Sequence, residues 1–437
     1  MKQIFSLVRN PLGRLQLLAE LSELAWPTLR RVATSYRWTL ARKTRIVAVV
    51  GSFGKSTTMR AVTVALGRSV HRRAMANSSS NVAKALLRIR PSDRHAVIEV
   101  GIAVPGQMAK YARIIQPDIT VVTSIGSDHN RSLKTLEVTR SEKAEMVRIL
   151  PSWGIAVLNG DDSNVLWMRD QTCARVITFG FAASNDVHAS DVNLDWPSGI
   201  RFTVHAASET RTLRTQLMGK HMVYPILAAV AVSLAEGLTF EQIIPALEAL
   251  RATPGRMELI RLANGGRILR DDYKSGLETI DAALDALAEI PAQRRVIVMG
   301  EISEPPGSQG QIYRRLGERV GHIVSLAIFV GASSAWSPFA TGVKRGGLPP
   351  DRIINAGGSV RKSVEVLRDN VRPDDVVLVK GRGNQRLERV VLGLMGRVVD
   401  CDVSFCNAHV NCSRCPMLVA DGASPRAAKR TTTDLHS

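Results

Sequence analysis

The residues best suited to chemistry lie in a short turn that contains two glycines. The turn follows residues 45–50, an apolar stretch expected to be a buried strand, and precedes a helix expected over residues 55–66. Such a turn can direct backbone N–H groups at phosphate oxygens, and the helix start adds partial positive charge. Its residues are Gly51, Ser52, Phe53, Gly54, Lys55, Ser56 and Thr57.

The polar side chains of this turn fit a nucleotide phosphate. Lys55 can neutralise β- and γ-phosphates, and the Ser56 hydroxyl can bind Mg²⁺. The full phosphate-loop pattern has a further glycine where Val49 stands, so an ordinary strand–helix turn is the alternative. A Gly-Lys-Ser sequence between a strand and a helix favours phosphate binding.

Two polar residues lie near or after the ends of expected strands. Glu99 lies near the end of a strand expected over residues 96–100, where a carboxylate is costly unless it meets a cation or reaches solvent. His129 follows a strand expected over residues 118–123, near the edge at which α/β sheets bind ligands. A histidine in such a loop can equally be only solvated, so a ligand role and a solvated role are both open.

Four cysteines lie close together near the end of the sequence. Cys401, Cys406, Cys412 and Cys415 occupy fifteen residues, with His409 between them as a substitute ligand. The last pair has the spacing of a metal knuckle, and four thiolates can hold Zn²⁺ tetrahedrally. An iron–sulfur cluster is the competing interpretation, and free cysteines are the third. We expect a structural role or the docking of a protein partner there. Cys173 stands apart and is expected in the core.

Composition narrows the class of protein. The chain has 437 residues, 45% of them hydrophobic, enough for more than one packed core. No apolar stretch is long enough for a transmembrane helix, and no signal peptide is recognisable. Because five cysteines do not suggest a disulfide scaffold, we expect a reducing, cytoplasmic compartment.

The formal charge of +19 is concentrated partly at the start of the chain. Residues 1–45 hold nine Lys or Arg against Glu20 and Glu23. Without an aromatic-interleaved basic ribbon or a recognition helix, a nucleic-acid partner is not expected. The arm could contact an anionic membrane at its inner face. The interpretation that we favour packs its apolar residues on the central domain.

Short β-branched stretches alternate with helical ones, which indicates an α/β fold with mainly parallel sheets. We expect a basic helical arm over residues 1–44, a central phosphate-binding domain over 45–252, a Rossmann-like domain over 253–400, and a Cys-rich metal-binding segment with a disordered tail over 401–437. Further strands are expected at residues 154–158, 267–269, 295–299, 322–330 and 375–379. Further helices are expected at residues 139–150, 239–250 and 277–287.

Several short motifs occur in an order that resembles the Mur ligase family over about residues 45–395. The phosphate loop lacks its first glycine, as in that family. The other matching segments are Thr123-Ser124-Ile125-Gly126-Ser127-Asp128-His129, Asn159-Gly160-Asp161-Asp162, Pro254-Gly255-Arg256-Met257-Glu258 and Val379-Lys380-Gly381. The resemblance is strongest to the branch that adds D-Ala-D-Ala to the UDP-MurNAc-tripeptide in cell-wall biogenesis.

The resemblance implies a central ATP-binding domain, a C-terminal ligase domain and a ligase reaction. ATP would phosphorylate a carboxylate substrate, and an amino acid or other amine would attack the acyl phosphate, releasing ADP and phosphate. It places Mg²⁺ on Glu99 and His129, and a carbamylated lysine that binds a second Mg²⁺ at Lys143. A lysine between Glu142 and Glu145 could otherwise be a surface helix residue.

In the C-terminal domain, the resemblance places Arg256, Asp272 and Lys380 near ATP or substrate. The alternatives for these three side chains are structural salt bridges or solvation at strand ends.

Three departures from the family pattern bear on function. Only fifty residues precede Gly51, so the family's UDP-sugar domain is not expected here. Met222 and Pro225 stand where the family has asparagines that help to read adenine, and neither side chain offers an amide. Gly276-Leu277 replaces an Asn-Pro pair. The departures leave a second hypothesis, a non-catalytic nucleotide-binding subunit or scaffold that works with a partner enzyme.

Overall fold

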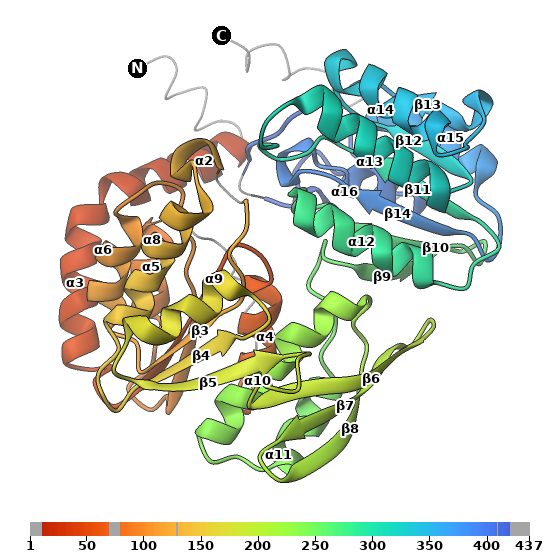
Figure 1. Ribbon diagram of the computed structural model, residues 1–437. Coiled ribbons are helices and arrows are strands. Elements are labelled where there is room, and N and C mark those ends of the chain that lie inside the picture. Colours follow the sequence, from red (N-terminus) through yellow and green to blue (C-terminus); the bar gives the residue numbers. More distant parts are fainter. Residues whose placement is uncertain (1–10, 70–78, 128–129, 409, 420–437) are drawn as a thin grey trace, which may run out of the picture. The chain divides into compact units, whose positions relative to one another are not determined.

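The computed structural model describes residues 11–69, 79–127, 130–408 and 410–419 (Figure 1). The chain divides into two compact units. Residues 21–253 form one, called here the P-loop unit, and residues 254–419 with 11–20 form the described part of the other, called the C-terminal unit. Within the described ranges, no helix is both long and apolar enough to cross a membrane. The expectation of a disordered tail after residue 420 lies outside these ranges.

The P-loop unit is built on an eight-stranded sheet in its described part, with the order β2-β1-β3-β4-β5-β6-β7-β8. The first six of these strands pair in parallel, whereas β7 and β8 are antiparallel additions at the end. The strands are β1 (Arg45–Val50), β2 (His95–Glu99), β3 (Ile119–Val122), β4 (Ile155–Asn159), β5 (Arg175–Gly180), β6 (Val187–Asp195), β7 (Gly199–Ala206) and β8 (Glu209–Thr215). Since β1 to β5 run in parallel, the turns that follow them meet at one edge of the sheet.

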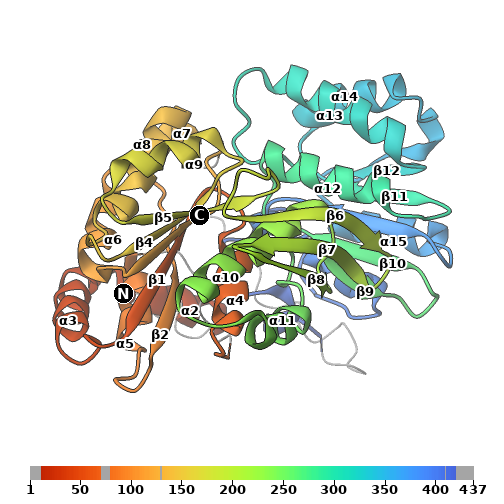
Figure 2. The same cartoon turned by 60° about the horizontal axis from the view of Figure 1, so that its bottom comes forward.

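Helices cover both faces of the parallel strands (Figure 2). One face carries α4 and α10, which pack against each other, and the other carries α6 and α8. The helices of this unit are α3 (Trp26–Trp38), α4 (Lys55–Ala65), α5 (Ser79–Leu87), α6 (Gln107–Ile115), α7 (Asn130–Leu133), α8 (Leu136–Arg148), α9 (Ser163–Leu166), α10 (Val223–Ala235) and α11 (Phe240–Glu248). The β1 side chains face apolar layers on both sides, which explains the unbroken burial of its last five residues.

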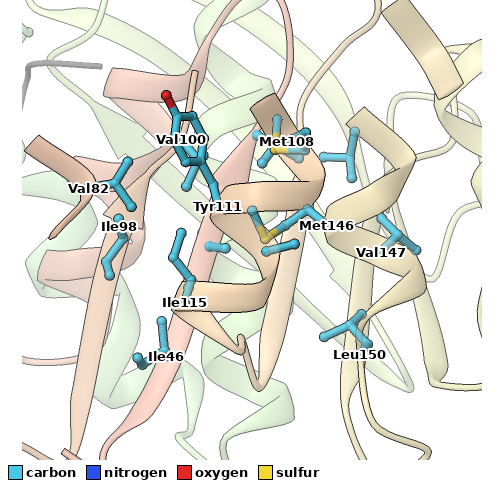
Figure 3. Close-up of a cluster of buried hydrophobic side chains, with 14 of the residues drawn as sticks. Ile46, Val82, Ile98, Val100, Met108, Tyr111, Ile115, Met146, Val147 and Leu150 are labelled. Atoms are coloured by element: carbon cyan, nitrogen blue, oxygen red, sulfur yellow. The ribbon is translucent and has the colours of Figure 1, made fainter. Parts of the chain in front are cut away.

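The core beneath α6 and α8 fixes these helices on the sheet (Figure 3). The cluster includes Ile46 of β1 and Ile98 of β2, Met108 and Ile115 of α6, and Met146 of α8, and Figure 3 shows Ile46 close to Ile115. Each of these side chains is at most 4% exposed. Burial of one such side chain contributes about 1.5–3 kcal/mol, so this layer holds α8 firmly beside the sheet.

The C-terminal unit contains a second sheet, with the order β13-β12-β11-β14-β10-β9 among the described residues. All neighbours pair in parallel except β9, which is antiparallel to β10. The strands are β9 (Glu258–Arg261), β10 (Arg267–Asp271), β11 (Arg295–Met299), β12 (Leu326–Phe329), β13 (Ile353–Asn355) and β14 (Val376–Lys380). The helices are α12 (Leu277–Glu289), α13 (Gln309–Ile323), α14 (Ser333–Arg345), α15 (Val360–Asn370) and α16 (Glu388–Leu394). Figure 2 shows α12 and α13 on one face of this sheet and α15 on the other.

The α/β class and most expected elements are confirmed, with two corrections. The strand expected over residues 322–330 is wrong at its start, because α13 continues to Ile323 and β12 is only Leu326–Phe329. Cys173 is exposed rather than in the core, since it lies in the turn before β5 while the neighbouring Ala174 is buried. Six strands of the described residues, β5, β6, β7, β8, β9 and β13, were not expected, although the alternating buried residues of β7 (Ile200, Phe202 and Val204) could have indicated that strand.

The basic arm forms helices α2 (Pro11–Leu24) and α3. Arg37 of α3 is 8% exposed and reaches Asp118, at 3.1 Å, before β3. The same guanidinium donates to the carbonyl oxygens of Ile115, Ala41, Thr44 and Gln116. Ala33 lies in the core of this unit and Trp26 packs against it, so the favoured interpretation is confirmed for part of α3, whereas Leu18 and Trp38 of the arm are exposed.

Replacement of Arg37 by Met should destabilise the P-loop unit by about 3 kcal/mol, because the Asp118 carboxylate would lose its buried cation. The urea midpoint measured by circular dichroism tests this, with Arg31→Met, an exposed position on the same helix, as the matched control. Equal midpoints for the two variants would contradict a structural role for Arg37.

Candidate nucleotide and ligase site

The turn after β1 adopts a backbone that requires its two glycines. Gly51 has φ +144° and Gly54 has φ +81°, a region that other residues rarely adopt. A Cβ on Gly51 would come within 2.0 Å of the Thr123 hydroxyl oxygen. Gly54 is the N-cap of α4, so the first-turn amides of that helix begin beside a residue without a side chain. The turn thus has the open, amide-rich form of an anion cradle.

The end of β3 holds this turn in place through a set of hydrogen bonds. The Ser52 amide donates to the Ser124 carbonyl at 2.8 Å, and the Phe53 amide donates to the Ser124 hydroxyl at 3.0 Å. The Thr123 hydroxyl donates to the Phe53 carbonyl at 2.5 Å. The Thr-Ser pair of the second motif is therefore what positions the phosphate loop.

Lys55 is folded back over the turn from the first position of α4. Its ammonium group donates to the carbonyl oxygens of Gly51 at 2.8 Å and Ser52 at 2.9 Å, and the side chain is 7% exposed. A lysine held over the cradle in this way lies where it can meet phosphate charge. Ser56 and Thr57 follow it and are both buried, with the Thr57 hydroxyl 3.2 Å from that of Thr253.

Lys143 reaches the same turn from α8. The side chain is 3% exposed, and its ammonium group donates to the Ser52 hydroxyl at 2.6 Å. The alternative of a surface helix residue is therefore wrong for Lys143. Its neighbour Glu142 instead faces outward and accepts hydrogen bonds from the Gly106 amide. The structure thus brings Lys143, Ser52 and Lys55 together.

Glu99 ends β2 directly beside β1. It is 6% exposed, and its Cα pairs in register with that of Val49, two residues before the cradle. A solvent-exposed strand end is thus wrong for Glu99. The carboxylate and the Ser56 hydroxyl are oxygen donors of the kind that Mg²⁺ prefers, at the edge where the phosphate loop begins, so this donor set fits the ion. His129 lies outside the described residues.

Residues 159–162, the Asn-Gly-Asp-Asp motif, form hydrogen bonds with neighbouring segments at this edge of the sheet. Asn159 donates to the Thr123 carbonyl at 2.9 Å, and Asp162 accepts from the Ile125 amide at 2.8 Å while it caps α9. Asp161 accepts from the Tyr224 hydroxyl at 3.0 Å. Burial and the nearby Asp161 raise the pKa of Tyr224, which keeps it a hydrogen-bond donor.

The two changed positions near the start of α10 are both buried. Met222 is 7% exposed, and Pro225 also lies in the buried part of this helix. Neither residue offers a polar side chain, but the same segment contains Tyr224 and Lys220. The Lys220 ammonium group lies 5.0 Å from the centre of the Phe181 ring. Phe181 and Tyr224 form an edge-to-face pair at 4.8 Å. The aromatic pair is a feature that sequence reasoning missed.

The C-terminal unit places its three predicted site residues around the ends of β10 and β14. The Arg256 guanidinium lies over the Tyr273 ring at 4.6 Å. Lys380 is 1% exposed and donates to Asp271 at 2.6 Å and to the Lys274 carbonyl at 2.7 Å. Burial lowers the pKa of Lys380, although Asp271 opposes the shift. The salt-bridge interpretation therefore describes what Lys380 does in this unit.

Asp272 belongs to a buried charge cluster around Arg270. The Arg270 guanidinium lies 3.0 Å from Asp272, 3.5 Å from Glu258 and 3.3 Å from Glu388. Burial raises the pKa of Asp272 to about 6, although the Arg270 charge opposes the shift. Nothing local in the sequence pairs Arg270 with Glu388, so sequence reasoning missed both residues.

The Cys-rich segment is part of the C-terminal unit. Cys412 is buried, Cys401, Cys406 and Cys415 are half-buried, and all four are free thiols. Among the described residues, no three His, Cys, Asp or Glu side chains are grouped closely enough to hold a metal ion. His409 lies outside the described residues. The four thiols nevertheless share one short loop, and Cys401 and Cys406 are close enough to contribute to a raised Cys415 pKa, for which burial is the main cause.

A phosphate cradle followed by a helix, two lysines that converge on it and a buried carboxylate define a nucleotide-dependent enzyme domain. Residues 49–233 match the Mur ligase middle domain, and residues 255–383 match the Mur ligase glutamate ligase domain.

Known proteins of this kind align over most of the chain. The UDP-N-acetylmuramoyl-tripeptide–D-alanyl-D-alanine ligase of Mycobacterium tuberculosis is 31% identical over 355 residues, which cover 77% of this chain and 70% of that protein. The Escherichia coli enzyme of the same name is 28% identical over 357 residues, with coverages of 80% and 76%. The structure of the MurF ligase of Thermotoga maritima in complex with ADP has a TM-score of 0.74 at 22% identity, covering 85% of this chain and 84% of that one.

The chain therefore belongs to the Mur ligase family. It is an ATP-dependent ligase that joins a carboxylate to an amine. The resemblance predicted from the short motifs is confirmed.

Proposed function

We propose that this ligase joins a peptide-like carboxylate to the amine of an amino acid or short peptide. The observation that carries the proposal is the convergence of Lys55 and Lys143 on the Ser52 turn. A carboxylate oxygen of the substrate attacks the γ-phosphorus of ATP, and ADP leaves. The amine then attacks the acyl carbon, phosphate leaves, and the amine loses a proton.

Residues of the P-loop unit suit the first step. Backbone amides of the turn would face the phosphates, and Lys55 would neutralise the charge that develops between the β- and γ-phosphates. Glu99 and Ser56 would hold Mg²⁺, which when bound neutralises phosphate charge. His129 is proposed as a further ligand. In the C-terminal unit, Arg256, Asp272 and Lys380 are proposed to contact ATP or substrate.

The names of the relatives indicate where the search for substrates should begin. Those relatives are named as ligases of UDP-N-acetylmuramoyl-tripeptide and D-alanyl-D-alanine. We propose substrates of the same chemical class, a peptide with a free carboxylate and an amino acid or dipeptide with a free amine. Such substrates would place the protein in cell-wall peptide chemistry.

The first test measures ADP release from the full chain with a panel of peptide carboxylates and amines. Lys55→Ala should lower the rate by about 100-fold or more, because the main cation over the phosphates is lost. Lys110→Ala, an exposed lysine on α6, is the matched control and should keep the wild-type rate.

Two results would count against the proposal. Wild-type ADP release by a folded Lys55→Ala protein would overturn the role of the phosphate loop. Tight ATP binding without turnover for any acid–amine pair would favour the second hypothesis, a nucleotide-binding subunit that works with a partner enzyme.

We propose that Lys143 acts after carbamylation, as a carboxylate ligand for a second Mg²⁺. Its burial beside the cradle supports this, because a buried ammonium group is costly and a carbamate would carry the charge that the metal needs. The bond between Lys143 and Ser52 then describes the unmodified side chain.

Lys143→Ala should lower ADP release by about 100-fold, and acetate or another small carboxylate should restore part of it by filling the vacated space. Lys55→Ala, which removes a cation and not a carboxylate ligand, should show no such rescue. Full activity of Lys143→Ala without added carboxylate would exclude the role.

We also propose that Cys401, Cys406, Cys412 and Cys415 hold one Zn²⁺. The spacing supports this, as does the turn at the last pair, in which the Cys415 amide donates to the Cys412 carbonyl at 3.2 Å. Closure of the loop by local movement would bring the thiolates to bonding distance. An iron–sulfur cluster remains the competing occupant.

Elemental analysis of protein purified anaerobically without chelator should find about one zinc per chain. The Cys412→Ser/Cys415→Ser variant should lose that zinc, whereas Cys173→Ser, which removes the exposed cysteine outside the loop, should keep it. Iron with inorganic sulfide would replace zinc in the proposal, and absence of any metal would refute the site.

We propose in addition that the arm can contact an anionic membrane. Leu24 of α2 is 77% exposed and Val32 of α3 is 49% exposed, with the exposed Arg30 and Arg31 between them. Each basic residue near such a surface contributes about 1 kcal/mol. Flotation with phosphatidylglycerol vesicles should recover the protein at low salt and not at high salt, whereas Arg30→Gln/Arg31→Gln should float less. Equal recovery with neutral vesicles, or none with either, would contradict the proposal.

A further inference from the structure

The Cys-rich segment forms a loop that is closed at its base. Val399 and Leu418 form an antiparallel bridge, and the Asp400 amide donates to the Met417 carbonyl at 2.9 Å. The Val419 amide donates in turn to the Val398 carbonyl at 2.9 Å. All four clustered cysteines lie between these two ends. We call residues 399–419 the cysteine loop.

Two arginines, one just before α16 and one in its first turn, hold the cysteine loop by its backbone. Arg389 donates to the carbonyl oxygens of Cys401 at 2.8 Å and Val403 at 2.7 Å. Arg386 donates to the Cys406 carbonyl at 3.2 Å. The Cys406 amide also donates to the Asn384 carbonyl at 2.7 Å. The loop is thus a packed part of the C-terminal unit.

Glu388 connects the cysteine loop to the interior of the unit. Its side chain is 4% exposed. One carboxylate oxygen accepts from the Cys412 amide at 2.8 Å, and the other lies 3.3 Å from the Arg270 guanidinium. A carboxylate buried to this degree is costly unless both partners stay in place.

Arg270 also contacts the segment that contains Arg256. Its guanidinium pairs with Glu258 at 3.5 Å, and the same Glu258 oxygen accepts from the Gly255 amide at 3.0 Å. Gly255 and Glu258 flank Arg256 on both sides. A continuous set of polar contacts therefore runs from Cys412 through Glu388 and Arg270 to residues 254–258.

We propose that the cysteine loop supports residues 254–258 through Glu388 and Arg270, which are positioning residues for Arg256. Metal binding by the cysteines would then stabilise the position of Arg256, by holding the Cys412 amide on Glu388. This inference rests on two proposed functions, zinc at the cysteines and a role of Arg256 in the ligase reaction.

The contacts explain why the carboxylate of Glu388 matters more than its bulk. A glutamine there could still accept from the Cys412 amide, but it would carry no charge for Arg270. Arg270 would keep Asp272 and Glu258 as partners and lose the contact that leads to the loop. Glu388→Gln thus separates the docking of the loop from its connection to residues 254–258.

The test compares Glu388→Gln with Glu365→Gln, an exposed position on α15, in the full chain. Hydrogen exchange at residues 254–258 should become about tenfold faster in Glu388→Gln, because a contact between buried charged groups is lost. Exchange at residues 399–419 and at residues 45–65 should stay unchanged, and so should the zinc content. The kcat for ADP release should fall about tenfold. The KM for ATP should stay nearly constant, because the phosphate loop and Arg256 belong to different units.

A second arm removes the zinc with a chelator and repeats the exchange measurement. Faster exchange at both residues 399–419 and residues 254–258 supports the coupling, whereas a change confined to residues 399–419 overturns it. Arg270→Lys, which keeps one charge but cannot form a planar fork, should behave as Glu388→Gln does and provides a second variant.

The outcomes separate this inference from the functions on which it rests. Wild-type exchange at residues 254–258 in Glu388→Gln and Arg270→Lys overturns the support, whatever the metal content. Absence of zinc from the purified protein refutes the metal site, and the two variants then decide the support alone. Altered exchange with unchanged kcat would show that residues 254–258 are held but that Arg256 has no part in the reaction, which overturns the positioning role.

Discussion

Fixation of the phosphate turn by the end of β3 is the constraint on which the P-loop unit depends. A turn with φ values of +144° and +81° at its glycines has no regular hydrogen-bonding pattern of its own, so its polar groups need partners elsewhere. Ser124 and Thr123 supply them, and Asn159 and Asp162 hold the residues around that pair in turn. Polar residues at or just after the ends of β2, β3 and β4 therefore lie at one edge of the sheet, so the geometry of the site depends on the pairing of these strands.

The C-terminal unit contains charged groups that are buried and paired with one another. Arg270 has three carboxylates around it and Lys380 has Asp271, and all of these groups lie at the ends of strands or at the start of α16. A buried ion pair contributes little net stability compared with apolar packing, but the loss of one partner is costly. Such a cluster therefore fixes geometry more than it adds stability.

Local patterns in the sequence were enough for β1 to β4 and for the glycine turn, but not for the parallel strands β5, β6 and β13. Residues 45–50 form β1, as expected for a short β-branched apolar stretch that ends at the glycine turn. The family resemblance favoured a site role for Lys143, whereas the flanking Glu142 and Glu145 left an exposed helix residue as the alternative. The buried positions of α8, Thr139, Lys143, Ala144, Met146 and Val147, follow a helical period that could have revealed the burial of Lys143. The contact between Arg270 and Glu388 joins residues more than a hundred positions apart, so no local pattern could predict it.

The closed base of the cysteine loop means that the chain enters and leaves it at nearly the same place. A loop of this kind can be lengthened, shortened or exchanged without displacing the strands and helices around it, because the two ends are already adjacent. Side-chain changes at the positions of residues 400–417 other than the four cysteines should therefore have little effect on the rest of the fold. The backbone contacts limit this freedom, so any replacement loop must still present an N–H group to Glu388 and carbonyl oxygens to Arg386 and Arg389.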